Sequence, residues 1–242
     1  MLRTQHIATG RWSIRADDLP TQFQPQNNCL YQSLPENAGV GHSKTFHLDE
    51  GLNYIETLYT PSKDMSVLSF IEAQDPRIVV TLGVKGHSCF SGSRGGEVVF
   101  NEGHTSITAF NSSIGERQYE ANKTITQLRF SISKTWLDRY FGEDNCTHFF
   151  NKSGFQQLSY QPISHQGIIA AKQLLARNVS REVRPLFMHG QAMSLLAAEL
   201  GPLCQEKSES TGVFNQKDRE IAELARDPKD FDASKPVGMG AY

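Results

Sequence analysis

Short runs in which apolar and polar residues alternate fill the middle of this 242-residue chain, between residues 46 and 133. Alternation of this kind is typical of a β-strand that buries one of its two faces. Gly, Asn or Pro residues separate successive runs, which favours tight antiparallel connections. Short strands joined in this way predict a small antiparallel β-barrel or sandwich. We expect strands over residues 52–59, 65–71, 77–84, 87–91, 97–100, 105–110, 116–120 and 125–132.

The last predicted strand, over residues 125–132, shows the two faces most clearly. Its apolar side chains point one way and its polar side chains point the other, so one face is buried and one is wet. The apolar face carries Leu128, Phe130 and Ile132, and the polar face carries Gln127, Arg129 and Ser131.

After this strand the apolar period lengthens from two to about 3.6 residues, which predicts helices. Ser133 supplies an N-cap for a short helix over residues 134–141, and Gly142 ends that helix. After a loop region, Ser164 caps a second helix, and a third runs over residues 184–205.

Apolar residues nearly encircle the third predicted helix, so both of its sides need to be covered. One side packs on the barrel or on the preceding helix, and the other side is available to a second subunit. The leucines that we assign to this dimer contact are Leu186, Leu195, Leu196 and Leu200.

The order of these elements indicates an α+β protein with four parts. Residues 1–45 are polar and contain three prolines, which predicts an extended N-terminal arm with one or two short strands. Residues 46–162 form the barrel and residues 163–206 form a helical hairpin. Residues 207–242 are a polar linker that leads into one further helix.

Composition and charge narrow the possible functions. With 38% hydrophobic and 21% charged residues, the chain has the composition of a globular protein. Its net charge of −2 gives no electrostatic footprint for nucleic acid, and residues 213–242 hold five basic and six acidic residues. No apolar run approaches the ~18 residues that span a membrane, and the N-terminus lacks a signal-peptide core, so we expect a cytoplasmic protein without membrane contact.

The cysteines and histidines form no recognisable metal or catalytic motif. The four cysteines lie far apart and form no CxxC pair. A cupin-type metal barrel needs an HxH pair with a downstream Glu and His, and the nearest imitation, His87, Glu97 and His104, has the wrong spacing. No nucleophile elbow, phosphate-binding loop or dinucleotide fingerprint occurs. We therefore expect no catalytic residue, no metal site and no cofactor.

Four side chains on the predicted strands are candidates for ligand binding. They are polar or aromatic groups that can line a pocket and meet an anionic or aromatic ligand. The alternative is that they lie on the solvent face of the barrel. These residues are His87, Arg117, Tyr119 and Arg129.

Three segments, in this order, make the chain resemble the AraC-type transcription regulators, most closely their siderophore-responsive branch. Residues 47–52 look like that branch's entry into the barrel. Residues 128–137 look like its last barrel strand running into a helix, and residues 217–226 look like the first helix of its DNA reader. The resemblance implies a cupin-like sensor barrel, a homodimer and a small-molecule effector such as a ferric siderophore. DNA would be bound only through the reader domain.

The chain departs from the family after this last segment, because Pro228 stops the helix and the residues that follow have no helical period. We expect the paired helix-turn-helix reader to be largely missing, so that this chain does not bind operator DNA alone. The predicted function is thus the ligand-sensing and dimerisation module of an AraC-type regulator. A cupin-like metal-dependent enzyme is the alternative, and a scaffold protein with a barrel but no pocket is a third class.

Overall fold

Two β-sheets face each other in the computed structural model, which describes residues 10–71, 76–93, 95–151, 154–176 and 178–210. The strands of the large sheet are, in spatial order, β13 (Phe155–Pro162), β10 (His104–Phe110), β7 (Arg77–Lys85), β12 (Ile125–Ser133), β5 (Leu52–Pro61), β4 (Gly39–Asp49), β3 (Cys29–Ser33) and β2 (Thr21–Gln24). The strands of the small sheet are β1 (Trp12–Arg15), β6 (Met65–Ile71), β11 (Ser113–Tyr119), β8 (His87–Gly92) and β9 (Glu97–Asn101).

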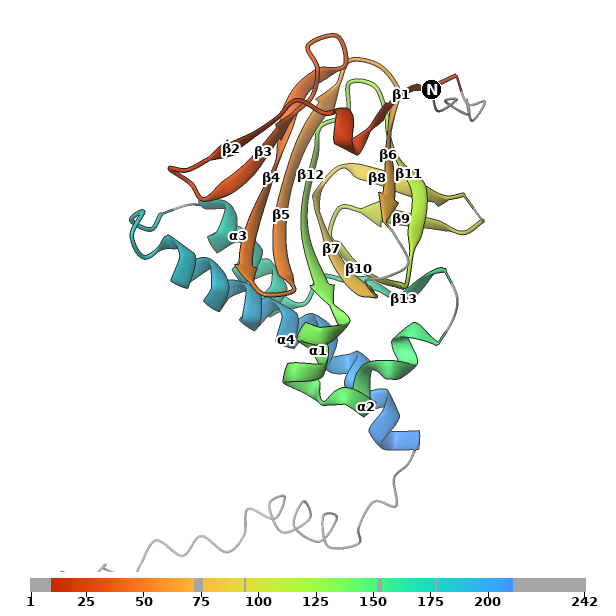
Figure 1. Cartoon of the computed structure of the whole chain (residues 1–242), viewed down its shortest axis with the longest axis vertical. Coiled ribbons are helices and arrows are strands. Elements are labelled where there is room, and N and C mark those ends of the chain that lie inside the picture. Colours follow the sequence, from red (N-terminus) through yellow and green to blue (C-terminus); the bar gives the residue numbers. More distant parts are fainter. Residues whose placement is uncertain (1–9, 72–75, 94, 152–153, 177, 211–242) are drawn as a thin grey trace, which may run out of the picture. The chain divides into compact units, whose positions relative to one another are not determined.

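Helices complete the fold and lie against the large sheet (Figure 1). They are α1 (Lys134–Phe141), α2 (Glu143–Cys146), α3 (His165–Ala176) and α4 (Arg184–Ser210), with the 3-10 helix η2 (Thr147–Phe150). A further 3-10 helix, η1 (Ala16–Asp18), contacts β6 of the small sheet instead. The predicted α+β class with a cupin-like pair of sheets is confirmed. Each of the eight predicted strands corresponds to one strand between β5 and β12.

The predicted capping residues set the helix ends. The Ser133 hydroxyl accepts a hydrogen bond from the Trp136 amide at 3.2 Å, and Gly142 ends α1 with a φ of 86°. The Ser164 hydroxyl accepts from the Gly167 amide at 2.9 Å at the start of α3. Each cap satisfies an amide that the first helical turn leaves unpaired.

The main apolar core lies between the large sheet and helices α3 and α4. Val80 and Phe130 of the sheet share one buried cluster with Ala170 of α3 and with Leu195 and Leu196 of α4. Burying a side chain such as leucine or phenylalanine stabilises the fold by about 1.5–3 kcal/mol. Because the apolar faces of the central strands turn toward the helices, their polar faces turn toward the small sheet.

β12 shows this division residue by residue. Leu128, Phe130 and Ile132 have no exposed surface and belong to the main core. Gln127 and Arg129 point the other way and hydrogen-bond to groups between the sheets. The alternation in the sequence was interpreted correctly, but the face expected to be wet is the inner face of the barrel.

The structure differs from two expectations, the separate N-terminal arm and the loop that was expected before Pro162. Residues 12–45 supply β1, β2, β3 and the first half of β4, so they belong to both sheets and are not a separate arm. β13 lies where a loop was expected, and it pairs antiparallel with β10 at the edge of the large sheet.

The dimer contact assigned to α4 is corrected as well. Leu195, Leu196 and Leu200 are at most 3% exposed, because the sheet and α3 of the same chain cover them. They cannot contact a second subunit while the chain is folded. Leu186 is 77% exposed and remains available for such a contact.

Within the described residues no helix combines the length and the apolar character needed to cross a membrane. The predicted first helix of a DNA reader, over residues 217–226, lies outside the described residues.

Candidate functional site

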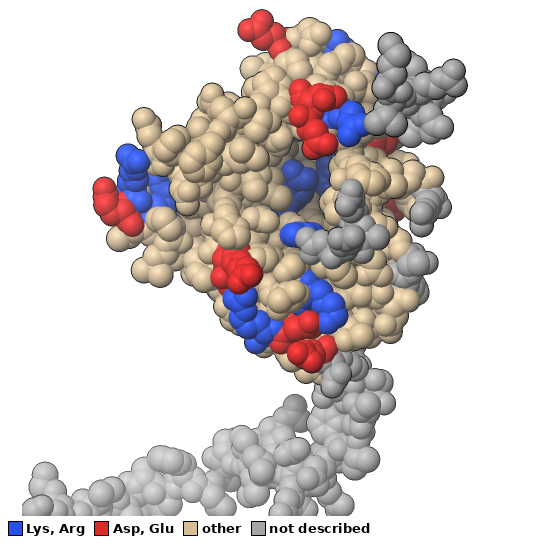
Figure 2. All heavy atoms as spheres, in the orientation of Figure 1, with Lys and Arg blue, Asp and Glu red and all other residues tan. Residues whose placement is uncertain are grey.

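A cavity of about 190 Å³ lies between the two sheets. Figure 2 shows a hollow at this place, with Lys or Arg atoms inside it. Strands of both sheets line the cavity, together with Ala16 of η1 and Leu19. Arg117 and Tyr119 come from β11 of the small sheet, and Arg129 comes from β12 of the large sheet. These three predicted ligand residues are thus brought together.

A chain of hydrogen bonds holds Arg117 in place. Its Nη1 donates to Gln127 Oε1 at 2.9 Å, and Gln127 Nε2 donates to the Ser88 hydroxyl at 2.8 Å. The guanidinium also lies 4.0 Å from the centre of the Phe100 ring, which is cation–π geometry. Arg117 is therefore oriented before any ligand arrives.

Arg129 is held in the same way from the large sheet. Its Nη2 donates to the Thr57 hydroxyl at 3.1 Å, and that hydroxyl lies 3.2 Å from the Ser43 hydroxyl. The Nε of Arg129 is buried and has no hydrogen-bond partner among the described residues.

The two arginines share the cavity, and no described acid balances their charge. Among the described residues, neither guanidinium has a carboxylate within 4.0 Å. Burial, together with the like charge of Arg129, lowers the pKa of Arg117 to about 10. A buried charge is costly unless it is paired, so this pair favours an anion between them.

Aromatic rings line the cavity beside the arginines. Tyr59 and Tyr119 meet edge to face with their ring centres 5.5 Å apart. Burial raises the pKa of Tyr59, so its hydroxyl stays neutral and can donate a hydrogen bond. Phe90 and Phe155 pack with their ring centres 4.8 Å apart. The cavity thus combines positive charge with apolar walls, as small-molecule sites do.

His87, the fourth predicted ligand residue, does not reach this cavity. It lies on the outer face of β8, where its Nε2 is 3.0 Å from Glu120 Oε1. Neighbouring Cys89 donates its thiol to Glu97 Oε1, and burial with this hydrogen bond raises the pKa of the thiol to about 12. Cys89 is thus a protonated thiol, which is a poor nucleophile.

Two groups of the site were not assigned from the sequence. Gln127 and Thr57 position the two arginines, and both are almost completely buried. Gln127 was placed on the same strand face as Arg129, and this shared face was the available signal. Thr57 gave no such signal, because its pairing with β12 depends on the sheet register.

The residues that imitate a cupin metal motif are engaged elsewhere. His104 stacks on Tyr160, with ring centres 4.9 Å apart, while His87 and Glu97 hold the partners described above. Over the ranges that the structure describes, no three His, Cys, Asp or Glu side chains gather as a metal site.

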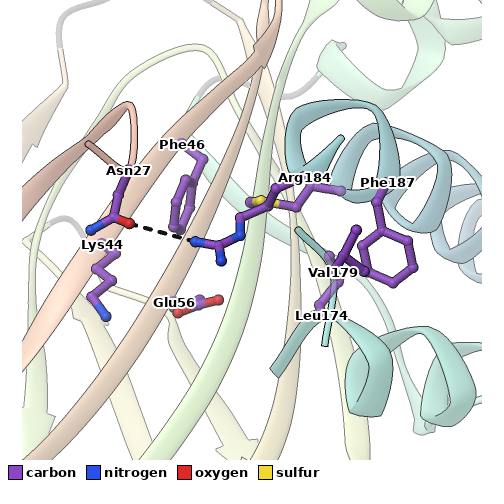
Figure 3. Close-up of a pocket in the computed structure, with 9 residues that line it drawn as sticks. Asn27, Lys44, Phe46, Glu56, Leu174, Val179, Arg184 and Phe187 are labelled. Carbon is purple, nitrogen blue, oxygen red and sulfur yellow. Dashed lines mark hydrogen bonds between the residues drawn. The ribbon is translucent and has the colours of Figure 1, made fainter. Parts of the chain in front are cut away.

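A second, much smaller cavity lies between β4 and the start of α4 (Figure 3). Its volume of about 20 Å³ is enough for one water molecule. Arg184 extends from α4 toward the β2–β3 turn and reaches Asn27 Oδ1 at 3.5 Å. Phe46, Phe187 and Leu174 surround it. The residues around this cavity connect the helices to the sheet, and the cavity itself is too small for an organic ligand.

Comparisons with known proteins agree with a regulatory role. The family model described as "Regulatory protein PchR N-terminal domain" matches residues 40–214. No curated protein matches the chain.

Solved structures show distant likenesses. The AraC-like transcriptional activator CuxR is 12% identical, with 84% of this chain and 83% of that chain covered and a TM-score of 0.41. An RmlC-like cupin protein from Desulfovibrio desulfuricans is 12% identical over 40% of this chain and 85% of that chain, with a TM-score of 0.30. One from Methanocaldococcus jannaschii is 10% identical over 43% and 88%, also with a TM-score of 0.30. Likeness at this level carries no argument about function.

Proposed function

Because the chain belongs to the family of the PchR N-terminal regulatory domain, we propose that it is the ligand-sensing module of an AraC-type transcription regulator. The effector binds between the two sheets, where Arg117 and Arg129 meet. The observation that carries this proposal is a cavity with two arginines and, among the described residues, no carboxylate beside them. A bound anion would supply the missing charge.

The lining of the cavity favours binding over catalysis. The described residues that line it include no His, Cys, Asp or Glu. General acid–base catalysis depends mostly on those residue types, and a serine or threonine nucleophile, such as the lining residues Ser113 and Thr108, needs an adjacent base to activate it. A metal-dependent enzyme, the second class considered, would also need convergent metal ligands. We therefore propose a non-enzymatic, cytoplasmic sensor.

A ferric siderophore is the effector that the family resemblance suggests. Such complexes often carry negative charge, and arginine presents a planar fork of donors that suits carboxylate and phenolate oxygens. Arg117 and Arg129 would take these oxygens, and Tyr119 would contribute to the wall.

A homodimer through the helices also belongs to this proposal. The outward faces of α3 and α4 carry Ile168, Ile169 and Leu186, which are 39%, 37% and 77% exposed. These exposed apolar side chains are the part of the two helices that a second subunit could cover. The proposed contact replaces the buried leucines first assigned to it.

Thermal unfolding with iron-loaded siderophores tests the proposal. A ligand that binds only the folded chain stabilises it by about 2.7 kcal/mol at a hundredfold excess over its Kd. We expect a higher melting temperature for the wild type, no shift for Arg117→Ala, and the wild-type shift for the surface control Arg15→Ala. A broad panel of siderophores and small organic acids that leaves the melting temperature unchanged would refute ligand sensing at this site.

A further inference from the structure

We infer that the cavity between the sheets recognises an aryl acid: one aromatic ring that carries a carboxylate or a similar oxygen-rich anionic group. This inference rests on the proposed function, because it assigns the ligand chemistry of the same cavity. Three features of the cavity support it: an acid-binding end, an aromatic lining and a small volume.

The acid-binding end is built by Arg117 and Arg129. Each guanidinium has five N–H donors, and each makes one hydrogen bond to a neutral side chain, Gln127 or Thr57. Two adjacent guanidinium groups with donors to spare fit an acceptor with two oxygens.

Aromatic side chains line much of the rest of the cavity, starting with Phe90, which is the cross-strand neighbour of Arg117. Along the inner face of the large sheet, polar Gln127 and Arg129 give way to Val79 on β7 and then to Phe110 on β10. Phe155 of β13 stacks near Phe110, with ring centres 6.3 Å apart. A ligand whose acid group meets the arginines therefore places its other end among aromatic rings.

A glycine on the small sheet shapes this aromatic lining. A Cβ on Gly115 would lie 2.5 Å from the Phe90 ring, so only glycine lets that ring approach β11 this closely. Phe90 packs on Phe155, and the two rings close the wall of the cavity. The aromatic lining is thus a built surface that depends on the absence of a side chain at Gly115.

Cavity volume limits the size of the ligand. At about 190 Å³, the space is smaller than the roughly 300–1,000 Å³ of a site for a drug-sized ligand. A single substituted ring fits this space. The ring can belong to a free aryl acid, or it can be the acidic aryl end of a larger ligand whose bulk stays at the mouth of the cavity.

Binding of benzoate to the full chain tests the inference, with its neutral isostere benzamide and inorganic phosphate as comparison ligands. We expect benzoate to raise the melting temperature and to bind at least about tenfold more tightly than benzamide or phosphate. Arg117→Gln and Arg129→Gln should each weaken benzoate by about tenfold or more, and Arg117→Lys, which keeps the charge but loses the fork, should recover part of the affinity. Arg15→Gln is the surface control.

Melting curves of the unliganded variants show whether each one is folded. If Arg117→Gln does not fold, Arg129→Gln still tests the inference. Equal binding of benzamide, equal binding of phosphate, or an unchanged benzoate affinity in both folded Gln variants would overturn the aryl-acid assignment. If ferric siderophores bind through Arg117 and benzoate does not, the inference fails and ligand sensing stands. If neither binds, both fail. If benzoate binds and siderophores do not, the ligand is a free aryl acid.

Discussion

Arg117 holds a charge in a place where the fold gains little from it. Its guanidinium is enclosed by the barrel, lies near Arg129, and has no carboxylate partner among the described residues. Replacing buried charges by apolar side chains of similar volume is often neutral or stabilising. A residue that costs stability in the empty protein indicates a role in binding.

We therefore predict that Arg117→Met raises the free energy of unfolding of the ligand-free protein by about 1 kcal/mol. Denaturant unfolding at neutral pH measures this change. The control Arg139→Met removes an arginine that lies 3.2 Å from Asp49, and it should lower the value by about 0.5 kcal/mol. A loss of more than about 1 kcal/mol in Arg117→Met would mean that this arginine supports the fold.

Asp49 shows the opposite case, a charge that the fold stabilises. Burial acts to raise the pKa of this carboxyl group, but the Glu50 amide, the Trp136 indole and the charge of Arg139 together hold it below its ordinary value of 3.8. A depressed carboxyl pKa gives stability that is fully present above pH 3.8 and is lost as the pH falls through the folded-state value.

Asp49→Asn should accordingly lower the free energy of unfolding by about 1 kcal/mol at pH 7. The difference from the wild type should shrink as the pH falls below 3.8, because the wild-type carboxyl group is then protonated. Urea unfolding across pH 2 to 7 (roughly the range of the carboxyl titration) measures both effects. Asp17→Asn, at an exposed ion pair, is the control, and a constant difference at every pH would contradict the assignment.

At the scale of the elements, the close pairing of β4 with β5 depends on glycine. Gly41 has a φ of +143°, and a Cβ there would lie 2.2 Å from the Leu58 carbonyl oxygen. A Cβ on Gly190 of α4 would have no atom within 4 Å, so the same change there meets open space. The same substitution, glycine to alanine, should therefore change the free energy of unfolding in opposite directions at these two positions.

We predict that Gly41→Ala lowers the free energy of unfolding by about 2 kcal/mol, because the strand must shift or accept strain. Gly190→Ala should raise it by about 0.5–1 kcal/mol, because alanine favours a helix interior. Thermal and urea unfolding of both variants measure the pair. Equal effects of the two substitutions would contradict this view of the β4–β5 contact.

The elements also show where sequence patterns succeed and fail. The strands from β5 to β12 were predicted because most have a covered face and hence regular apolar positions. The interior strand β4, which begins inside the predicted arm, was missed, and so were the edge strands β2 and β13. Their sequences, Thr21-Gln-Phe-Gln24 and Phe155-Gln-Gln-Leu-Ser-Tyr-Gln-Pro162, are rich in polar residues, and each pairs on one side. Without burial on a face, an edge strand leaves little periodic signal.

For the candidate site, alternation along β11 and β12 placed Arg117, Tyr119 and Arg129 on strands but did not say which face is the cavity. That depends on the helices, which cover the other face of the large sheet. His87 was misplaced for the same reason, because its side of β8 follows from the register with β9 and β11.

At the scale of the whole molecule, the proposed dimer predicts different results for the same substitution at two leucines of α4. Leu186→Glu should give a monomer whose melting temperature is unchanged, because this side chain is 77% exposed. Leu196→Glu should fail to fold, because it buries a charge in the main core. Val40→Glu, at an exposed strand position, is the control.

Analytical ultracentrifugation of the wild type and the variants checks this prediction. The dimer proposal fails if the wild type sediments as a monomer at tens of micromolar, which corresponds to an association weaker than about −6 kcal/mol.

One face of β12 lines the cavity, and its other face packs in the core against the helices. Arg129 lies between Leu128 and Phe130, so each residue that meets the ligand has a neighbour that meets the helices. Evolution can therefore alter ligand preference on this strand only by steps that leave the packing of α3 and α4 intact. β8 and β11 carry no such double duty, because no helix belongs to their clusters. We expect relatives with different effectors to diverge first at the inward positions of β8 and β11, and to keep β12 nearly unchanged.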